Sequence, residues 1–123
     1  MMKYKSINVL GTKLKECSCE PITGFFRDGC CNTSKQDLGM HTVCVVATKE
    51  FLEFSKSVGN DLSTDIPQFN FKGLKPGDRW CLCALRWKEA DNAGVAPPVL
   101  LESTHYETLK VIDIYQLQKY EVN

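Results

Sequence analysis

The stretch that decides the fold is Gly73–Trp87, which reads GLKPGDRWCLCALRW. Lys75-Pro76-Gly77-Asp78 is typical of a type II turn, because proline presets φ at the second position and glycine supplies the positive φ at the third. The apolar run that follows has almost no break, and in a strand both of its faces would be largely apolar. We therefore expect Arg79–Trp87 to be a strand at the centre of a sheet, covered on both sides.

Two further segments have the composition of strands and are expected to flank this one. Met40–Ala47 is apolar and β-branched, and Val99–Ser103 follows two prolines, which a strand tolerates at its first position. The sheet is expected to be small and either mixed or antiparallel. Its strand order does not follow from these patterns.

Helix signals lie after the second of these segments and near the C-terminus. Thr48 can cap a helix over Lys49–Val58, which carries an apolar stripe. Thr104 begins a capping-box pattern, and Asp113 can cap a last short helix. These elements predict an α+β fold, with residues 1–123 forming a single domain.

Composition limits the classes of function. Of the 123 residues, 43% are hydrophobic and 24% charged, as in ordinary globular domains. The 15 basic and 15 acidic side chains balance, which argues against a general nucleic-acid or anionic-membrane binder.

The N-terminal residues and the cysteines give an expected location. No apolar run approaches the roughly 20 residues of a membrane span, and the N-terminus lacks the apolar core of a signal peptide. We therefore expect a cytoplasmic protein whose seven cysteines are thiols.

Several segments together resemble one bacterial family, that catalogued as domain of unknown function 2237. The similarity runs in order along nearly the whole chain. The segments that carry it are Asn8–Gly11, Thr23–Cys31, His41–Cys44, Gly59–Thr64, Gly73–Trp87, Ala96–Val99 and Thr104-His105. Cys17 fits the family pattern and Cys19 does not. The resemblance implies a small stand-alone soluble domain and no particular activity.

The spacing of the cysteines does not predict a metal site or a cofactor. Structural zinc sites usually use chelating pairs spaced Cys-x2-4-Cys, and none of the cysteine pairs here has the spacing of a zinc knuckle or ribbon. His41 and Cys44 would point to opposite faces of a regular strand, and only a β-bulge would bring them together. Cys81 and Cys83 are expected to be small core residues.

A reactive thiol is the alternative hypothesis. Cys30 and Cys31 follow Arg27 in a predicted loop, and a nearby guanidinium favours the thiolate. A thiol-dependent enzyme or redox protein would use Cys30 or Cys31 with a histidine, and Asp28 or Asp61 would orient the imidazole.

The main hypothesis is a binding or interaction module. Arginines beside aromatic residues suit planar anionic groups, and polar loops on a rigid core commonly carry binding sites. The expected partner is a small anionic ligand or a protein. The predicted ligand-binding residues are Arg27, Asp28, Cys30, His41, Asp61, Arg79, Arg86 and His105.

Overall fold

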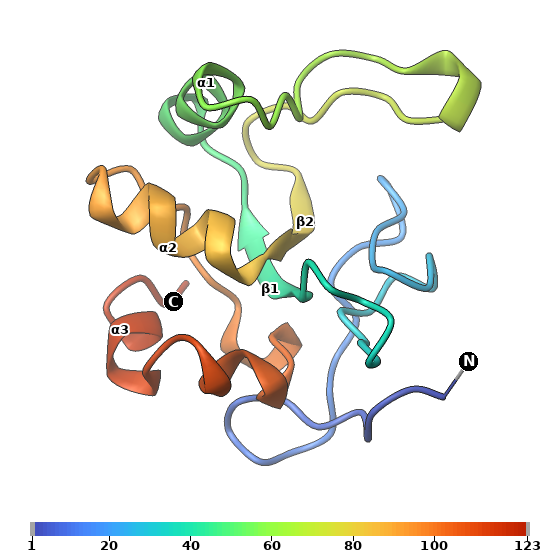
Figure 1. Cartoon of the computed structure of the whole chain (residues 1–123), viewed down its shortest axis with the longest axis vertical. Helices are drawn as coiled ribbons and strands as arrows, with labels where there is room; N and C mark the ends of the chain where they lie inside the picture. Colours follow the sequence, from blue (N-terminus) through green and yellow to red (C-terminus); the bar gives the residue numbers. More distant parts are fainter. Residues whose placement is uncertain (1, 123) are drawn as a thin grey trace.

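Two antiparallel strands, β1 (His41–Val46) and β2 (Arg79–Cys83), lie at the centre of the fold (Figure 1). The computed structural model describes residues 2–122. The four inner residues of β1 are buried, because this β-branched, apolar segment is covered on both faces. Helices pack around the pair, which gives the α+β class that the sequence predicts.

The predicted central strand ends early. At Ala84 the chain turns into helix α2 (Ala84–Asn92), so the expected strand over Arg79–Trp87 is wrong in its second half. Ala84, Trp87 and Ala90 are buried at a spacing of three residues, which is one face of a helix, whereas Leu85 is 62% exposed. The sequence hides this change of period, because Trp80–Leu85 is apolar throughout and no polar residue marks the boundary at Ala84.

The sheet also has a different centre from the one expected. Strand β1, not β2, is the middle element, because Val45 forms an isolated antiparallel bridge with Val99 on the side away from β2. The predicted strand over Val99–Ser103 is wrong, since the chain enters a 3₁₀ helix, η2 (Leu101–Ser103). The hydroxyl of Thr104 accepts the Cys44 N–H and donates to the Leu100 carbonyl, so a side chain replaces further strand pairing.

The predicted main helix is present as α1 (Lys49–Ser57). The hydroxyl of Thr48 accepts the N–H of Phe51 at 3.1 Å and caps the helix as expected. After it, the chain runs through a protruding loop that contains η1 (Pro67–Phe69). The loop returns to the sheet through the turn at Lys75–Asp78, where Gly77 has φ +97°.

Two short helices close the chain, η3 (Tyr106–Lys110) and α3 (Ile114–Gln118). Asp113 caps α3 as predicted, by accepting the Tyr115 N–H. At η3 the capping residue is His105 and not Thr104, because the Thr104 hydroxyl is already used between Cys44 and Leu100.

The cysteines do not behave as the expected set of thiols. Cys17 is joined to Cys44, and Cys31 to Cys81, in two buried disulfides. These bonds fasten the N-terminal segment to β1 and β2. Disulfides persist in oxidising compartments, so the argument for a cytoplasmic location from reduced cysteines loses its support.

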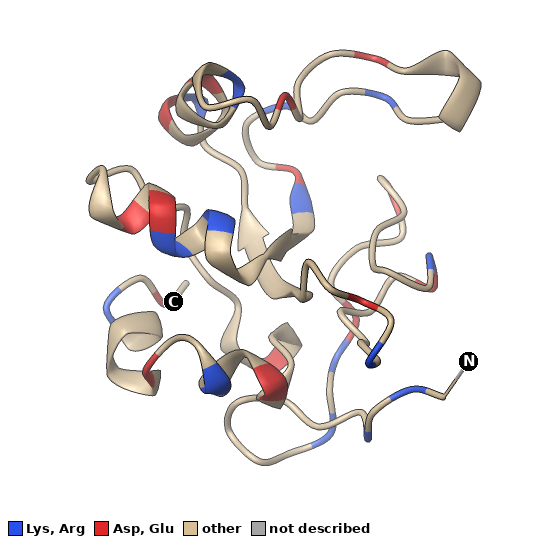
Figure 2. Ribbon diagram, in the orientation of Figure 1, with Lys and Arg blue, Asp and Glu red and all other residues tan. Residues whose placement is uncertain are grey.

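Charged side chains of both signs are interspersed along the chain (Figure 2). Within residues 2–122, no helix combines the length and the apolar character that crossing a bilayer requires.

Candidate functional site

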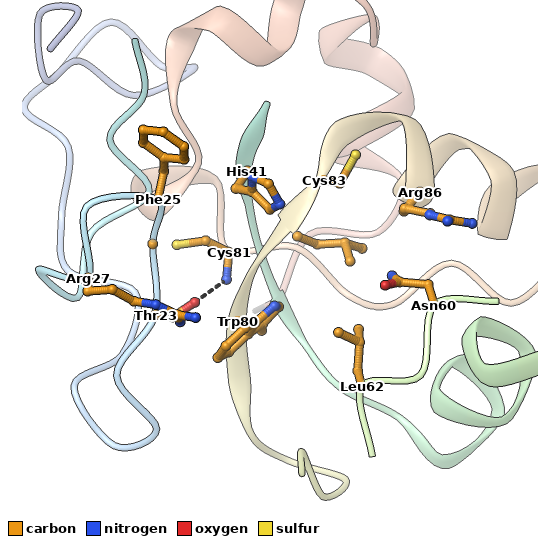
Figure 3. A pocket seen from close by; sticks show the side chains of 12 residues that line it. Thr23, Phe25, Arg27, His41, Asn60, Leu62, Trp80, Cys81, Cys83 and Arg86 are labelled. Atoms are coloured by element: carbon orange, nitrogen blue, oxygen red, sulfur yellow. Dashed lines mark hydrogen bonds between the residues drawn. The ribbon is translucent and has the colours of Figure 1, made fainter. Parts of the chain in front are cut away.

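A cavity of about 400 Å³ opens beside β2 (Figure 3). Its walls come from four segments: the loop over residues 23–27, the start of β1 at His41, strand β2 with the start of α2, and the loop at residues 60–62. The volume falls within the range of small-molecule binding sites, about 300–1,000 Å³.

The loop over residues 23–27 is fastened firmly to β2. The buried hydroxyl of Thr23 accepts the N–H of Cys81 at 2.9 Å (dashed in Figure 3). The Cys31–Cys81 disulfide adds a covalent link a few residues further on. Gly24 has φ +100°, and a Cβ there would lie 2.3 Å from the carbonyl oxygen of Cys30, so only glycine fits. The loop is therefore a preformed wall of the cavity.

Arg27 projects from this loop into the cavity lining. Its guanidinium carbon lies 5.5 Å from the centroid of the Trp80 ring, a cation–π distance. Its backbone is left-handed, with φ +55°, a conformation that costs a non-glycine residue about 1–2 kcal/mol. Among residues 2–122, Arg27 makes no salt bridge.

Arg86 lines the cavity on the other side of β2 (Figure 3). Its Nη1 donates to Glu89 at 3.1 Å and to the Val58 carbonyl at 3.4 Å. Those contacts hold the guanidinium at the rim, with donors left for a ligand.

His41 stands at the start of β1 and is held by Asp37. Its Nδ1 lies 2.7 Å from a carboxylate oxygen of Asp37, whose side chain is completely buried, while the His41 side chain is 44% exposed. The same carboxylate accepts the backbone N–H of His41 and the hydroxyl of Thr33. An imidazole that donates from Nδ1 presents Nε2 as an acceptor.

A β-bulge aligns His41 with Cys83. The register pairs His41 with Cys83 but Val43 with Leu82, so Thr42 is an extra residue on β1. The N–H of Ala84 donates to the Met40 carbonyl at 3.0 Å, which joins the start of α2 to the start of β1. Cys83 is a free thiol, lines the cavity, and is the N-cap residue of α2.

Three of the predicted ligand-binding residues line this cavity: Arg27, His41 and Arg86. Asp61 follows the lining residue Asn60, but its carboxylate accepts hydrogen bonds from Ser63 and Thr64. These bonds lower the pKa of Asp61, the Thr64 hydroxyl most strongly.

The other predicted residues lie elsewhere. Asp28 accepts from Lys3, Asn32 and the Cys30 N–H. Arg79 lines a separate cavity. His105 is buried, and its two ring nitrogens contact the Lys5 carbonyl and the Glu107 N–H.

The thiol hypothesis at Cys30 or Cys31 is not supported. Cys31 is bonded to Cys81 and is fully buried. Burial, together with the charges of Asp28 and Glu16, raises the pKa of the Cys30 thiol, which disfavours the thiolate. The expected orienting residues Asp28 and Asp61 do not hold a histidine, and Asp37 takes that role for His41.

Sequence reasoning missed Asp37, Trp80 and Cys83. The residues around Asp37 are typical of a polar loop, in which a contact between side chains four residues apart is not expected. A strand over Arg79–Trp87 predicts Cys83 as a core residue, and the change from strand to helix at Ala84 places it in the cavity lining instead.

The buried sulfurs of Cys17, Cys31 and Cys81 lie within 4.8 Å of one another, a separation that a metal ion could bridge. All three are engaged in disulfides, however, and a metal takes thiolates.

No curated protein matches this sequence. Residues 7–121 match the profile of a family described as uncharacterized protein conserved in bacteria (DUF2237). The match covers nearly the whole chain, including the disulfides and every wall of the cavity. The chain therefore belongs to the bacterial DUF2237 family.

Proposed function

We propose that the cavity beside β2 binds a small organic anion, and that binding this ligand is the function of the protein. The observation that carries the proposal is the charge of the lining. Two arginines and a histidine line the cavity, and among residues 2–122 no aspartate or glutamate does. Arg86 and His41 already pair with Glu89 and Asp37, which lie outside the lining, so within residues 2–122 Arg27 is the cavity cation without an acidic partner. A carboxylate or phosphate of a ligand would supply that partner, because guanidinium groups bind such groups through paired hydrogen bonds.

Two other cavities of the described chain carry both positive and negative side chains in their lining. A cavity of about 290 Å³ is lined by Lys15 and Arg79 but also by three glutamates. A third, of about 480 Å³, combines Lys88 with two aspartates. Their charges are satisfied locally, so neither favours an anion in the way that the first cavity does.

Arg27 supports the proposal further. The left-handed backbone of Arg27 is unfavourable by itself, and such conformations cluster at ligand-binding sites. Its guanidinium lies over Trp80 and makes no salt bridge within residues 2–122. This backbone conformation places the Arg27 guanidinium over the Trp80 ring, where an anionic group of a ligand could contact it.

The remaining lining defines the body of the ligand. Phe25, Leu62 and Trp80 add apolar surface to the same lining. A ligand with a flat or apolar body and one anionic group would use both parts of the cavity. We therefore expect aromatic or short aliphatic acids to bind more tightly than inorganic phosphate.

The test is an NMR titration of the ¹⁵N-labelled protein with benzoate, phenyl phosphate and inorganic phosphate, with benzamide as the neutral counterpart of benzoate. Arg27→Gln and Arg86→Gln should each weaken benzoate binding about tenfold or more, the cost of a charged hydrogen bond. Arg79→Gln is the matched control, since Arg79 lies outside this cavity. Equal binding of benzoate and benzamide, or equal loss in all three variants, would rule the proposal out.

A further inference from the structure

We propose that the four buried cysteines of this fold bind one zinc ion when their two disulfides are reduced. They are called the sulfur cluster below and are Cys17, Cys31, Cys44 and Cys81. The chain then carries either two disulfides or one tetrahedral zinc centre at the same place. The inference is independent of the proposed anion binding, because it uses the buried sulfur atoms and not the charges of the cavity.

The first support is the short distance between the sulfurs of the two disulfides. The sulfurs of Cys17, Cys31 and Cys81 lie within 4.8 Å of one another, and the sulfur of Cys44 is bonded to that of Cys17. A tetrahedral zinc ion with Zn–S distances of about 2.3 Å holds its four sulfurs about 3.8 Å apart. The Cys17 sulfur therefore already lies close to the other disulfide, and the main change on binding zinc is that each bonded pair parts.

The second support is that the bonded sulfurs can part without a movement of the backbone. The Cα atoms are 5.8 Å apart in the Cys17–Cys44 disulfide and 5.4 Å apart in the Cys31–Cys81 disulfide. Disulfide-bonded residues have Cβ atoms about 3.8 Å apart, and rotation about the Cα–Cβ bond carries a sulfur between staggered positions. A sulfur separation of about 3.8 Å is therefore within reach of each pair.

The third support is a set of hydrogen bonds around the cluster that do not involve sulfur. Cys44 and Cys81 are cross-strand partners in β1 and β2. The N–H of Cys17 donates to the Gly29 carbonyl at 2.8 Å, and the N–H of Gly29 donates to the Thr23 carbonyl at 3.0 Å. The Thr23 hydroxyl in turn accepts the N–H of Cys81 at 2.9 Å. These bonds join the segment of Cys17 to the strands, so the four thiols of the reduced protein stay together.

The donor set and its burial indicate the metal. Four cysteine ligands with no open position form a structural zinc site, and each residue of the cluster is at most 2% exposed. The spacing Cys-x2-4-Cys is not needed here, because the fold and not a chelating pair brings the sulfurs together. The zinc ion would fasten the N-terminal segment to β1 and β2, as the disulfides do.

The exchange between the two forms needs a reductant, which is a dithiol. Each disulfide takes two electrons and two protons from one dithiol, which becomes a disulfide itself, so two dithiols give four cysteine thiols. Zinc then replaces the thiol protons, because it binds thiolates. Disulfides are stable in an oxidising compartment and thiols in a reducing one, so the sulfur cluster can fasten the fold in both.

The first experiment is a Co²⁺ titration of the full chain, reduced with a phosphine in the absence of oxygen. Tetrahedral Co²⁺ with thiolate ligands has strong sulfur-to-metal charge-transfer bands, which should saturate at one Co²⁺ per chain. Zinc should displace the cobalt, with an apparent Kd of about 50 nM or tighter at pH 7. The disulfide-bonded protein is the matched control and should show no bands. Absence of the bands in the reduced protein, or a zinc Kd weaker than about 1 μM, would overturn the inference.

Two variants identify the sulfurs that bind the metal. Cys17→Ser/Cys31→Ser removes one cysteine of each disulfide and should abolish the charge-transfer bands. Cys19→Ser/Cys30→Ser/Cys83→Ser removes the three free cysteines and should keep the bands unchanged. Bands that persist in the first variant, or that disappear in the second, would show that the metal binds outside the sulfur cluster.

The second experiment needs no variant, so it holds even if the substituted chains do not fold. A ligand that binds the folded chain raises its melting temperature, so zinc should raise that of the reduced wild-type protein by about 5 °C or more. A chelator should reverse the shift, and Mg²⁺, which prefers oxygen ligands, should not cause it. If reduction alone unfolds the chain, zinc should restore its circular dichroism spectrum. A reduced protein on which zinc has no effect, or no more effect than Mg²⁺, would contradict the inference.

Discussion

The Nδ1 atom of His41 lies 2.7 Å from the carboxylate of Asp37, which is completely buried while the imidazole reaches the cavity. This pair connects the interior of the protein to the candidate site. It also gives a direct way to separate an effect on His41 from an effect on folding.

Asp37→Asn should leave the imidazole without its anionic partner. The imidazole would then lose the charged hydrogen bond that holds it at the cavity, so benzoate binding should weaken by up to about tenfold. Thr33→Val is the matched control, because it removes another hydrogen bond to the same carboxylate without touching the histidine. Equal loss in both variants would indicate a structural effect alone. The measurement is the NMR titration with benzoate, with the melting temperature of each variant.

Arg27→Gly separates binding from stability. Glycine relieves a left-handed conformation worth about 1–2 kcal/mol, loses about 0.5–1 kcal/mol through greater chain entropy, and forfeits the contact with Trp80. The free energy of unfolding should therefore stay within about 1 kcal/mol of wild type, while the benzoate-induced NMR shifts disappear.

The control for Arg27→Gly is Asn70→Gly. Asn70 has nearly the same backbone, with φ +53°, but lies after η1 and outside the cavity. It should keep benzoate binding unchanged. A loss of binding in Asn70→Gly, or retained binding in Arg27→Gly, would show that Arg27 is not part of the site.

The two disulfides should be visible chemically. In the absence of reductant, alkylation of the denatured chain should label three of its seven cysteines. Labelling of all seven would contradict the disulfides.

Chain separations of 27 and 50 residues correspond to roughly 3.5 and 4 kcal/mol of loop-closure entropy. Cys31→Ala/Cys81→Ala should lower the unfolding free energy by about 2–5 kcal/mol in urea titrations, and should weaken benzoate binding by loosening the Arg27 loop.

His105 should make folding sensitive to acid. Burial lowers the pKa of His105, because the charged imidazolium is poorly solvated there, and this outweighs the opposite effects of the Lys5 carbonyl and Glu107. Its Nδ1 accepts the Glu107 N–H. A proton on that nitrogen would replace this hydrogen bond by a contact between two donors.

The folded pKa of His105 thus lies below the unfolded value of about 6.5. The unfolded chain binds more protons near that pH, so the contribution of His105 to stability is complete above it and is lost as the pH falls. For one titrating group, the free energy of unfolding cannot change by more than about 1.4 kcal/mol per pH unit. The difference in unfolding free energy between wild type and His105→Asn should shrink from pH 7.5 to 5.5. A difference that grows from pH 7.5 to 5.5 would show that the pKa of His105 is not lowered in the folded protein.

The sequence predicted those parts of the fold that depend on local chemistry. The caps at Thr48 and Asp113 and the turn at Gly77 are set by side chains and backbone preferences within a few residues. The strand-to-helix change at Ala84 was not predictable in this way. It depends on tertiary packing of Trp87, whose Nε1 donates to the Pro97 carbonyl.

Part of the lining of the candidate cavity could also be predicted from local chemistry. Arginines beside aromatic residues drew attention to Arg27 and Arg86, and the structure places both at one cavity. Sequence spacing does not specify which cysteines are bonded to each other, because the partners are distant in the chain. It also does not specify the contact of Asp37 with His41, because that contact depends on the conformation of a loop. The bulge at Thr42, which sets His41 opposite Cys83, has no marker in the sequence.

The central claim is that the cavity beside β2 attracts anions, and one measurement tests it most directly. The rate constants for alkylation of Cys83 by negatively charged iodoacetate and by neutral iodoacetamide are compared in the Cys19→Ser/Cys30→Ser background. The ratio of the iodoacetate rate constant to the iodoacetamide rate constant should be about three- to tenfold higher for Cys83 than for glutathione. It should fall to the glutathione value in Arg27→Gln and Arg86→Gln but not in Arg79→Gln. A ratio at or below that of glutathione in the parent protein would contradict the account.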